Sequence, residues 1–365
     1  MKRIVIDART LRTSTGRYVE RLLHYLQQID RQHEYIVLLK PEDIAGWNPV
    51  RANFSKHVCP HKEFGFSEQI GFKKQLDGLR PDLVHFAMIQ QPIWYRGRVV
   101  TTMHDLTTMR FNNPSKNSAV FRFKQQVYKY VVWRVAHKSD ALITPSQFVA
   151  EDVLRYTGVK PGKITVTPEA ADPITARAKP FPQLAGKRFL MYVGRPTPHK
   201  NLERLIEAFS LLRARHPQLI LVLAGRKDAN YERVEDEAYV GGVKNLLFTD
   251  YVTEGQLRWL YERCEAYVFP SLSEGFGLPG LEAMQHGAPV VASRSTSLPE
   301  VYGDAALYFD PYNVQEMSET IESVLSDKNL RAGLIKKGHA RAATYSWRRM
   351  AEETLDGYKK VLKET

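Results

Sequence analysis

The chain is poor in cysteine, which argues against small domains that are stabilised by disulfides or by zinc. Its two cysteines, Cys59 and Cys264, lie far apart and have no partners at metal-ligand spacing. A disulfide scaffold and a zinc finger are therefore disfavoured, and a reducing cytosol fits the composition. The sequence also lacks a run of about 18 apolar residues, so no spanning helix is expected. Its first apolar run is too short for the core of a signal peptide.

Several catalytic motifs are missing as well. There is no D-x-D triplet and no cluster of histidine, cysteine and aspartate at metal-ligand spacing, so catalysis through a protein-held metal is disfavoured. There is no G-x-S-x-G elbow and no G-x-x-x-x-G-K-[ST] loop, so hydrolase and P-loop functions lose support.

Acidic residues are scarce in one half only. The first 180 residues hold 28 Lys and Arg against 16 Asp and Glu, which gives a net charge of +12; residues 181–365 hold 24 of each. A basic surface usually has an anionic partner, such as nucleic acid, a membrane or a phosphorylated ligand. The two halves therefore have different surfaces and different tasks.

Residues 106–139 contain no acidic residue at all and interleave cations with aromatic side chains. Three interpretations stay open: a largely buried helix whose cations reach outward, a helix on an anionic membrane or lipid phosphate, and a nucleic-acid surface, which is the least favoured. The residues concerned are Arg110, Lys116, Arg122, Lys124, Lys129, Arg134 and Lys138, with Phe111, Phe121, Phe123, Tyr128, Tyr130 and Trp133.

Short β-rich runs alternate with helical patterns along the whole chain, which predicts an α/β fold with parallel sheets. Residues 172–187 contain three prolines and no apolar period, so they predict a linker. We expect strands at 3–7, 35–39, 82–86, 99–103, 141–144 and 164–167, then at 189–193, 219–224, 246–248, 266–269, 289–292 and 307–309. Helices are expected at 16–29, 67–79, 117–138 and 146–157, then at 201–215, 253–263, 279–286, 314–326, 328–344 and 347–363.

This pattern predicts two doubly wound domains that face each other across a cleft, where ligands bind outside the carboxyl ends of the strands. The predicted divisions are an N-terminal domain (1–172), a linker (173–187), a C-terminal domain (188–345) and a last helix (346–365).

The densest motif is a glycine-rich segment that follows an expected strand and opens a helix. It carries two carboxylates, Glu274 and Glu282, which could bind the hydroxyls of a ribose or a hexose. The helix start offers free N–H groups to a phosphate. A tight loop with capping carboxylates is the plain alternative. The segment also contains a literal G-x-G-x-x-G, but the acidic residue of a dinucleotide site is missing from the next strand, so a dehydrogenase is disfavoured.

Three further motifs follow expected strands. Arg195 and Lys200 lie beside a glycine turn and a helix start, where they could bind a pyrophosphate; two solvated surface cations are the plain alternative. Asn201 is a good N-cap residue. His104 ends a strand, where it could contact a ligand or be a structural residue, and we expect Asp105 to orient it. Gly16 opens the first helix, where it could let the backbone approach a ligand or simply begin the helix.

The set GR-x-x-P-HKN at 194–201, E-GFGLPGLE-AM from Glu274 onward and LPEV-x-GDAALYFDP near residue 300 closely resembles the retaining glycosyltransferases of family 4, which have the GT-B fold. The similarity covers essentially the whole chain and is strongest in residues 188–312. Within that family the chain looks most like bacterial mannosyltransferases of cell-surface polysaccharide synthesis.

The resemblance implies that residues 1–172 form the acceptor-side domain, that residues 188–345 bind the nucleotide sugar, and that the helix at 346–365 crosses back to the N-terminal domain. It also implies a role for each matching position. Arg195 and Lys200 would hold the donor diphosphate, Glu282 the ribose, and Glu274 the transferred sugar. His104 would lie against that sugar, so His104, Glu274, Arg195 and Lys200 form the implied catalytic set. Other donor-binding positions are Gly16, Gly275, Phe276, Gly277 and Leu278. The sequence departs from the family where Ser14-Thr15-Gly16 supplies one glycine instead of two, and where Asp250 replaces a glycine near the expected base.

The same resemblance implies a retaining hexosyltransferase without metal or cofactor. The preferred co-substrate is GDP-mannose, with UDP-sugars as the alternative, and the acceptor is a glycan or a lipid-linked glycan. Front-face attack by the acceptor hydroxyl fits retention without an enzyme nucleophile. An epimerase or phosphorylase of similar fold, and a non-enzymatic membrane- or polyanion-binding protein, are the competing classes. The expected location is the cytoplasm, with peripheral contact at the inner face of the membrane and no nucleic-acid partner.

Overall fold

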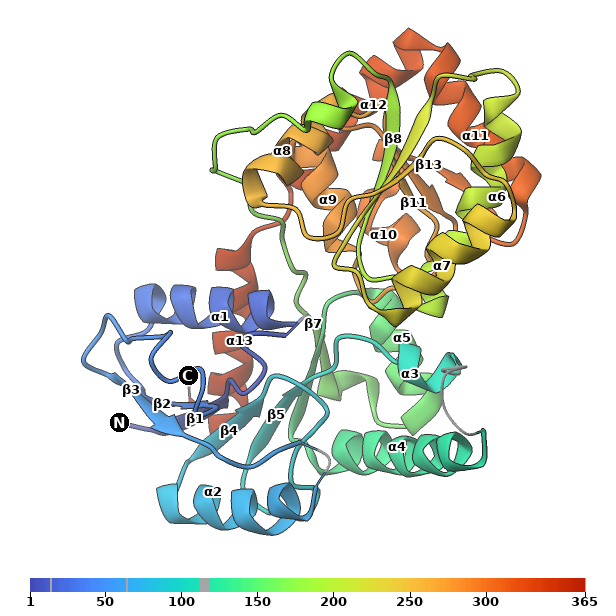
Figure 1. The fold of residues 1–365 in the computed structure, drawn as a ribbon. Coiled ribbons are helices and arrows are strands. Elements are labelled where there is room, and N and C mark those ends of the chain that lie inside the picture. Colours follow the sequence, from blue (N-terminus) through green and yellow to red (C-terminus); the bar gives the residue numbers. More distant parts are fainter. Residues whose placement is uncertain (14, 64, 112–117, 365) are drawn as a thin grey trace. The chain divides into compact units, whose positions relative to one another are not determined.

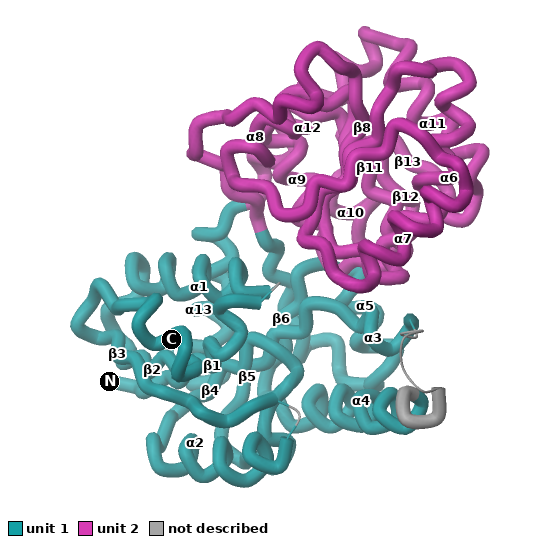
Figure 2. Tube along the Cα trace, viewed as in Figure 1, with its two compact units in different colours: residues 1–169, 346–365 teal, residues 170–345 magenta. Residues whose placement is uncertain are grey.

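A computed structural model describes the chain except for residues 14, 64, 112–117 and 365, and except for the side chains of 118–121. Lys116 and the side chain of Phe121 therefore lie outside the described residues. The chain forms two compact units (Figure 2): unit 1 comprises Met1–Glu169 with Ser346–Thr365, and unit 2 comprises Ala170–Tyr345.

Unit 1 is built on a parallel sheet in the order β3-β2-β1-β4-β5-β6-β7. Buried aliphatic runs form the central strands, because both faces of a parallel sheet are covered. The sequence failed to predict β3, whose residues Ser55, Lys56 and His57 are too polar for a buried run and lie at the edge of the sheet. The strands are β1 Arg3–Asp7, β2 Glu34–Leu39, β3 Phe54–Val58, β4 Leu83–Phe86, β5 Val99–Thr102, β6 Ala141–Thr144 and β7 Ile164–Val166.

Helices cover both faces of this sheet (Figure 1). The last helix, α13, packs beside α1, and Tyr358 of α13 hydrogen-bonds His85 of β4 at 2.5 Å. The short α3 was not predicted. The helical segments are α1 Gly16–Ile29, η1 Ser67–Phe72, α2 Lys73–Leu79, α3 Thr107–Arg110, α4 Ser118–Lys138, α5 Gln147–Thr157, η2 Pro161–Lys163 and α13 Trp347–Leu362.

Helix α4 packs one face on unit 1 and exposes aromatic side chains on the other. Val132, Val135 and Ala136 are buried in the core, whereas Phe123 is 71% exposed and Tyr130 53% exposed. Val127 and Trp133 are also exposed on this helix. The interpretation of 106–139 as a largely buried helix with outward cations is therefore wrong for this face of α4. None of the helices in the described part of the chain has the length and apolarity that a membrane span needs.

Unit 2 repeats the arrangement with a sheet in the order β10-β9-β8-β11-β12-β13, all parallel. This is the strand order of a Rossmann-like doubly wound sheet. The strands are β8 Phe189–Val193, β9 Ile220–Ala224, β10 Leu246–Phe248, β11 Ala266–Phe269, β12 Val290–Ser293 and β13 Ala306–Phe309.

The helices of unit 2 match the expected ones except for α7 and the short α10. Helix α7 is rich in charge and buries only Tyr231, Val234 and Ala238; its N-cap Asp228 accepts from two backbone N–H groups. The segments are η3 Pro182–Leu184, η4 Pro198–Lys200, α6 Leu202–Arg213, α7 Ala229–Val240, α8 Glu254–Arg263, α9 Leu278–Gln285, α10 Leu298–Tyr302, η5 Gly303–Ala305, α11 Val314–Ser326 and α12 Lys328–Ala342.

The proline-rich segment 173–187 belongs to unit 2 in the structure. Phe181 and Leu184 are buried in the core of that unit, and the Lys179 N–H donates to the Gly255 carbonyl at 2.8 Å. The segment is therefore packed against the unit that follows it.

Candidate active site

The two motifs of unit 2 that the sequence predicts to bind the donor lie where the sheet changes direction. Strands β8 and β11 are neighbours, but the chain continues from β8 to β9 on one side and from β11 to β12 on the other. The loops that follow two such strands diverge, and the crevice at their carboxyl ends is where doubly wound sheets bind ligands. Residues 194–201 follow β8 and residues 270–277 follow β11, so the topology brings the two strongest motifs together.

A lysine–glutamate ion pair joins these two loops. Lys200 Nζ lies 2.6 Å from Glu274 Oε1, and the two side chains are only 19% and 13% exposed. The same ammonium lies 5.6 Å from the centre of the Phe269 ring. Two of the predicted donor ligands therefore contact each other, in a partly desolvated position where charge-assisted hydrogen bonds are strong.

Asn201 stands at the predicted N-cap position of α6, but its side chain holds the surrounding loops instead of capping the helix. Its side chain caps no helix N–H; its Nδ2 donates to the carbonyls of Pro270 at 3.1 Å and Pro311 at 2.8 Å. Asn201 has a φ of 60°, a left-handed conformation that asparagine tolerates better than most residues. Its Oδ1, the atom that could accept from a helix N–H, instead accepts from Arg204 Nη1 at 2.8 Å, so no side-chain cap forms.

Arg195 lies apart from this ion pair. Its side chain is 75% exposed and its Nη2 lies 3.4 Å from Asp228 Oδ2 at the start of α7. Such an exposed contact is weak, so the guanidinium can turn toward an anionic ligand at little cost.

Glu282, the second carboxylate, lies on α9 and is 7% exposed. Tyr261 Oη donates to its Oε2 at 3.3 Å. Helix α9 begins at Leu278 directly after Gly277, which has a φ of 95° and no capping side chain. Phe276 is buried and packs edge-on against Tyr345, with ring centres 5.3 Å apart. The helix start and both carboxylates thus lie on one continuous segment.

Two glycines of this segment make room for a buried tyrosine. Tyr302 Oη donates to the Gly277 carbonyl at 2.5 Å. A Cβ on Gly280 would lie 2.3 Å from that hydroxyl and 2.4 Å from Tyr302 Cζ. Gly280→Ala should therefore break the Tyr302 contact and lower the free energy of unfolding by about 1–3 kcal/mol, as overpacked sites do.

Urea unfolding measures this effect, and Gly333→Ala in α12 is the matched control. A Cβ on Gly333 meets nothing within 4 Å, so alanine there should stabilise the helix by up to about 1 kcal/mol. Equal unfolding midpoints for the two variants would contradict the packing argument.

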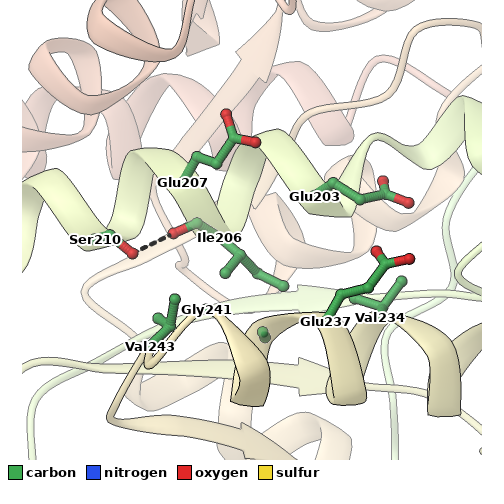
Figure 3. Close-up of a pocket in the computed structure, with 9 residues that line it drawn as sticks. Glu203, Ile206, Glu207, Ser210, Val234, Glu237, Gly241 and Val243 are labelled. Atoms are coloured by element: carbon green, nitrogen blue, oxygen red, sulfur yellow. Dashed lines mark hydrogen bonds between the residues drawn. The ribbon is translucent and has the colours of Figure 1, made fainter.

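A separate hollow of about 430 Å³ lies between α6 and α7 of unit 2 (Figure 3). Its walls carry the carboxylates of Glu203, Glu207 and Glu237 above an apolar floor that includes Ile206 and Val234. Carboxylates repel a diphosphate, so this hollow does not suit the donor.

In unit 1, His104 is held by a residue that the sequence did not single out. Its Nδ1 lies 3.0 Å from Glu169 Oε1, and its Nε2 lies 3.0 Å from the Ala87 carbonyl oxygen. The expected partner, Asp105, instead accepts from the Thr107 N–H at 2.7 Å. The prediction that Asp105 orients His104 is wrong because its carboxylate is used at the start of α3. Glu169 follows β7, so the rule that functional side chains follow strand ends could have found it.

Both partners of His104 are acceptors, so the ring satisfies both only when it carries two protons. Burial alone would lower the pKa of His104, but the hydrogen bond and charge of Glu169 outweigh it and raise the pKa above its ordinary value. Both contacts therefore favour the protonated imidazolium over the neutral ring.

Glu169→Gln should lower the pKa of His104, because the amide keeps a hydrogen-bond acceptor but loses the charge. In the wild type the ion pair contributes its full stability below the ordinary histidine pKa of about 6.5, and that contribution is lost as pH rises through the raised pKa of the folded state. The difference in unfolding free energy between wild type and variant should therefore be largest in acid and shrink above neutral pH.

NMR titration of the His104 ring gives the pKa directly. Asp105→Asn is the matched control and should lower the pKa less, since Asp105 contributes only a minor charge effect. An equal or larger fall in the pKa of His104 with Asp105→Asn would show that Asp105, and not Glu169, orients the ring.

Gly16 opens α1, and its lack of a side chain is required. A Cβ there would lie 1.9 Å from the backbone carbonyl oxygen of Leu11. The loop after β1 therefore folds back onto the helix start, and this close approach explains the glycine. Ligand binding by the backbone of Gly16 stays a prediction. Among the residues with a described position, no group of three or more His, Cys, Asp or Glu could hold a metal ion.

Comparison with known proteins agrees with this architecture. Residues 15–174 match the family described as Glycosyltransferase Family 4, and residues 176–341 match Glycosyl transferases group 1. The O-antigen chain mannosyltransferase B of Escherichia coli is 31% identical over 278 residues, which cover 72% of this chain and 70% of that protein. The serotype-specific mannosyltransferase WbdA of Escherichia coli is 34% identical over 241 residues, which cover 62% of this chain but only 30% of WbdA.

A solved sucrose-phosphate synthase from Thermosynechococcus elongatus has the same fold, with a TM-score of 0.78, 19% identity and full coverage of both chains. The two Rossmann-like units thus define a glycosyltransferase of the GT-B fold, as predicted. The chain belongs to glycosyltransferase family 4. A glycosyltransferase uses a sugar donor and an acceptor, and the roles of individual residues are taken up next.

Proposed function

We propose that this enzyme transfers mannose from GDP-mannose, with retention of configuration, to a glycan or lipid-linked glycan. The observation that carries the proposal is the Lys200–Glu274 pair at the point where the unit 2 sheet changes direction. It supplies a cation for a diphosphate and a carboxylate for sugar hydroxyls side by side. The mannosyltransferase relatives support the choice of sugar.

In this proposal each cation has a task on the donor. Lys200 leaves Glu274 to bind the diphosphate, and the exposed Arg195 turns from Asp228 to the same group. Glu274 is then available for the transferred sugar, and the buried Glu282 accepts hydrogen bonds from the ribose. The backbone of Gly275, Phe276, Gly277 and Leu278 at the start of α9 adds N–H groups and a positive helix dipole.

The reaction proposed is a front-face displacement. The acceptor oxygen forms a bond to the anomeric carbon while the bond from that carbon to the diphosphate oxygen breaks. The hydroxyl proton passes to the leaving diphosphate, whose charge Lys200 and Arg195 stabilise. Both ring nitrogens of His104 face acceptors, so neither nitrogen is available to act as the base. No metal or cofactor takes part.

Asp250 supports guanine as the base. It stands where the family usually has glycine, and its φ of 57° keeps the glycine-like backbone. Its Oδ1 accepts from the Lys227 N–H at 2.8 Å. A carboxylate near the base can accept from both N1–H and the 2-amino group of guanine, whereas uracil offers one such N–H.

A thermal-shift panel with GDP, UDP, ADP and their sugar conjugates tests the donor. We expect GDP and GDP-mannose to raise the unfolding temperature most, and Asp250→Asn to reduce that preference over UDP. A larger rise in unfolding temperature with a UDP-sugar would show that the donor is a UDP-sugar and not GDP-mannose. No rise with any nucleotide would overturn the proposed site.

We also propose that unit 1 docks on the anionic inner face of the membrane in the cytoplasm. The exposed Phe123, Val127 and Tyr130 recur at helical spacing on α4, and Arg122 and Lys124 lie beside them. Aromatic side chains insert at the headgroup level, and each nearby cation adds about 1 kcal/mol against anionic lipid.

Sedimentation with phosphatidylglycerol-containing and pure phosphatidylcholine vesicles tests the docking surface. The wild type should bind the anionic vesicles, and Phe123→Ser with Tyr130→Ser should lose most of that binding. Tyr239→Ser in unit 2, a side chain 85% exposed, is the control for lost surface aromatics. Binding that ignores lipid charge would overturn the proposal.

A further inference from the structure

Hydroxyl groups at the end of β12 and directly after it hold the loop that follows β11. Ser293 Oγ donates to the Ser271 carbonyl at 2.5 Å, and Ser295 Oγ donates to the Leu272 carbonyl at 2.7 Å. The next two hydroxyls both meet Glu274. Its backbone N–H donates to Thr296 Oγ1 at 2.9 Å, and its carbonyl accepts from Ser297 Oγ at 3.0 Å. Both backbone polar groups of Glu274 are therefore fixed by two consecutive side chains, which we call the hydroxyl clamp (Thr296 and Ser297).

The conformation of Thr296 shows that this contact is retained against a local cost. Thr296 has a φ of 52°, in the left-handed region that β-branched residues seldom adopt. Strained residues of this kind persist where the surrounding structure over-determines them, and they cluster at functional sites. Glycine or asparagine would adopt this backbone more easily, but glycine has no hydroxyl to accept from the Glu274 N–H.

We infer that the hydroxyl clamp positions Glu274 for the transferred sugar. This inference rests on the role proposed for Glu274 above. In the structure Lys200 holds the Glu274 carboxylate, with 2.6 Å between the charged atoms. Once the donor diphosphate draws Lys200 away, the carboxylate loses that partner. The backbone contacts of Thr296 and Ser297 then keep Glu274 in place, so Thr296 is a positioning residue that touches no substrate.

Thr296→Val tests the inference because valine keeps the shape and the branching but accepts no hydrogen bond. Loss of one such bond should lower kcat about tenfold, with the KM for the donor and the Kd for the nucleoside diphosphate changed less than twofold. Hydrogen exchange at the Glu274 amide should become faster. Thr296→Ser keeps the hydroxyl and should restore kcat to within about twofold of the wild type.

Thr320→Val is the matched control, because the Thr320 hydroxyl donates to the Glu316 carbonyl of its own helix, 2.7 Å away. It should leave kcat and exchange at Glu274 unchanged. Normal kcat in Thr296→Val, together with a defective Glu274→Gln, would overturn the clamp alone. Normal transfer by Glu274→Gln would overturn the proposed role of Glu274 and the clamp with it. A Thr296→Ser variant as slow as Thr296→Val would also overturn the inference, because the hydroxyl would not be the determinant.

Discussion

Lys200→Met should lower kcat/KM by about 100- to 1000-fold, the effect of removing one donor that stabilises developing charge in a preorganised site. Methionine keeps most of the volume of the side chain but removes the cation from the leaving diphosphate. It also leaves the Glu274 carboxylate, only 13% exposed, without its partner in the loop after β11. Steady-state kinetics with the preferred donor measures the first effect, and calorimetry with the nucleoside diphosphate shows how much of it is ground-state binding.

A double-variant cycle separates a catalytic pair from a structural one. If Lys200 and Glu274 only hold two loops together, Lys200→Met with Glu274→Gln should regain much of the activity, because no unpaired charge is left. If each residue acts on the donor, the double variant should stay as inactive as either single one. Lys337→Met is the control for loss of a surface pair, since Lys337 Nζ lies 3.0 Å from Asp304 Oδ2 with both side chains exposed; its kinetics should be unchanged.

The parts of this molecule that the sequence predicts well are those set by local burial and by strand order. Strand 3–7 and helix 16–29 have the expected bounds, because an unbroken buried run and a regular apolar period leave few alternatives. The polar edge strand β3 and the charged helix α7 were not predicted from the sequence, because their burial depends on neighbours that no local pattern reveals. Lys200 and Glu274 could be placed together because each follows the carboxyl end of a strand.

The contacts that tune the site could not be predicted in the same way. Glu169 and His104 are 65 residues apart, and Asp105 was the more obvious partner by distance along the chain. Asn201 fits the N-cap preference, yet its side chain is drawn to two carbonyls that only the folded sheet brings within reach. Thr296 has an unremarkable sequence context, and only its backbone angle reveals the strain.

Arg9→Met should destabilise unit 1 by about 3–5 kcal/mol, the cost of removing one partner from a buried ionic cluster. The Arg9 side chain is 1% exposed; its Nε and Nη2 bind the two carboxylate oxygens of Asp7 at 2.9 and 2.8 Å, and Nη2 also lies 3.0 Å from Glu68 Oε1. The variant leaves the buried carboxylates of Asp7 and Glu68 without the guanidinium that pairs with them. Arg9→Lys should recover little of the lost stability, because an ammonium cannot reproduce the bidentate contact with Asp7.

The expected loss of stability reaches the loops that follow β1 and β3 as well as the core of unit 1. Arg9 Nη1 donates to the His61 carbonyl at 3.0 Å, so one guanidinium connects the ends of β1 and the chain after β3. Hydrogen exchange in Arg9→Met should therefore rise in these loops of unit 1, while unit 2 keeps its protection and its Kd for the nucleoside diphosphate. Lys73→Met, which removes an exposed pair with Asp77 at 2.7 Å, should change neither. Faster exchange that spread equally through unit 2 would show that the two units unfold together, and the effect of Arg9 would then be one of global stability rather than of the loops of unit 1.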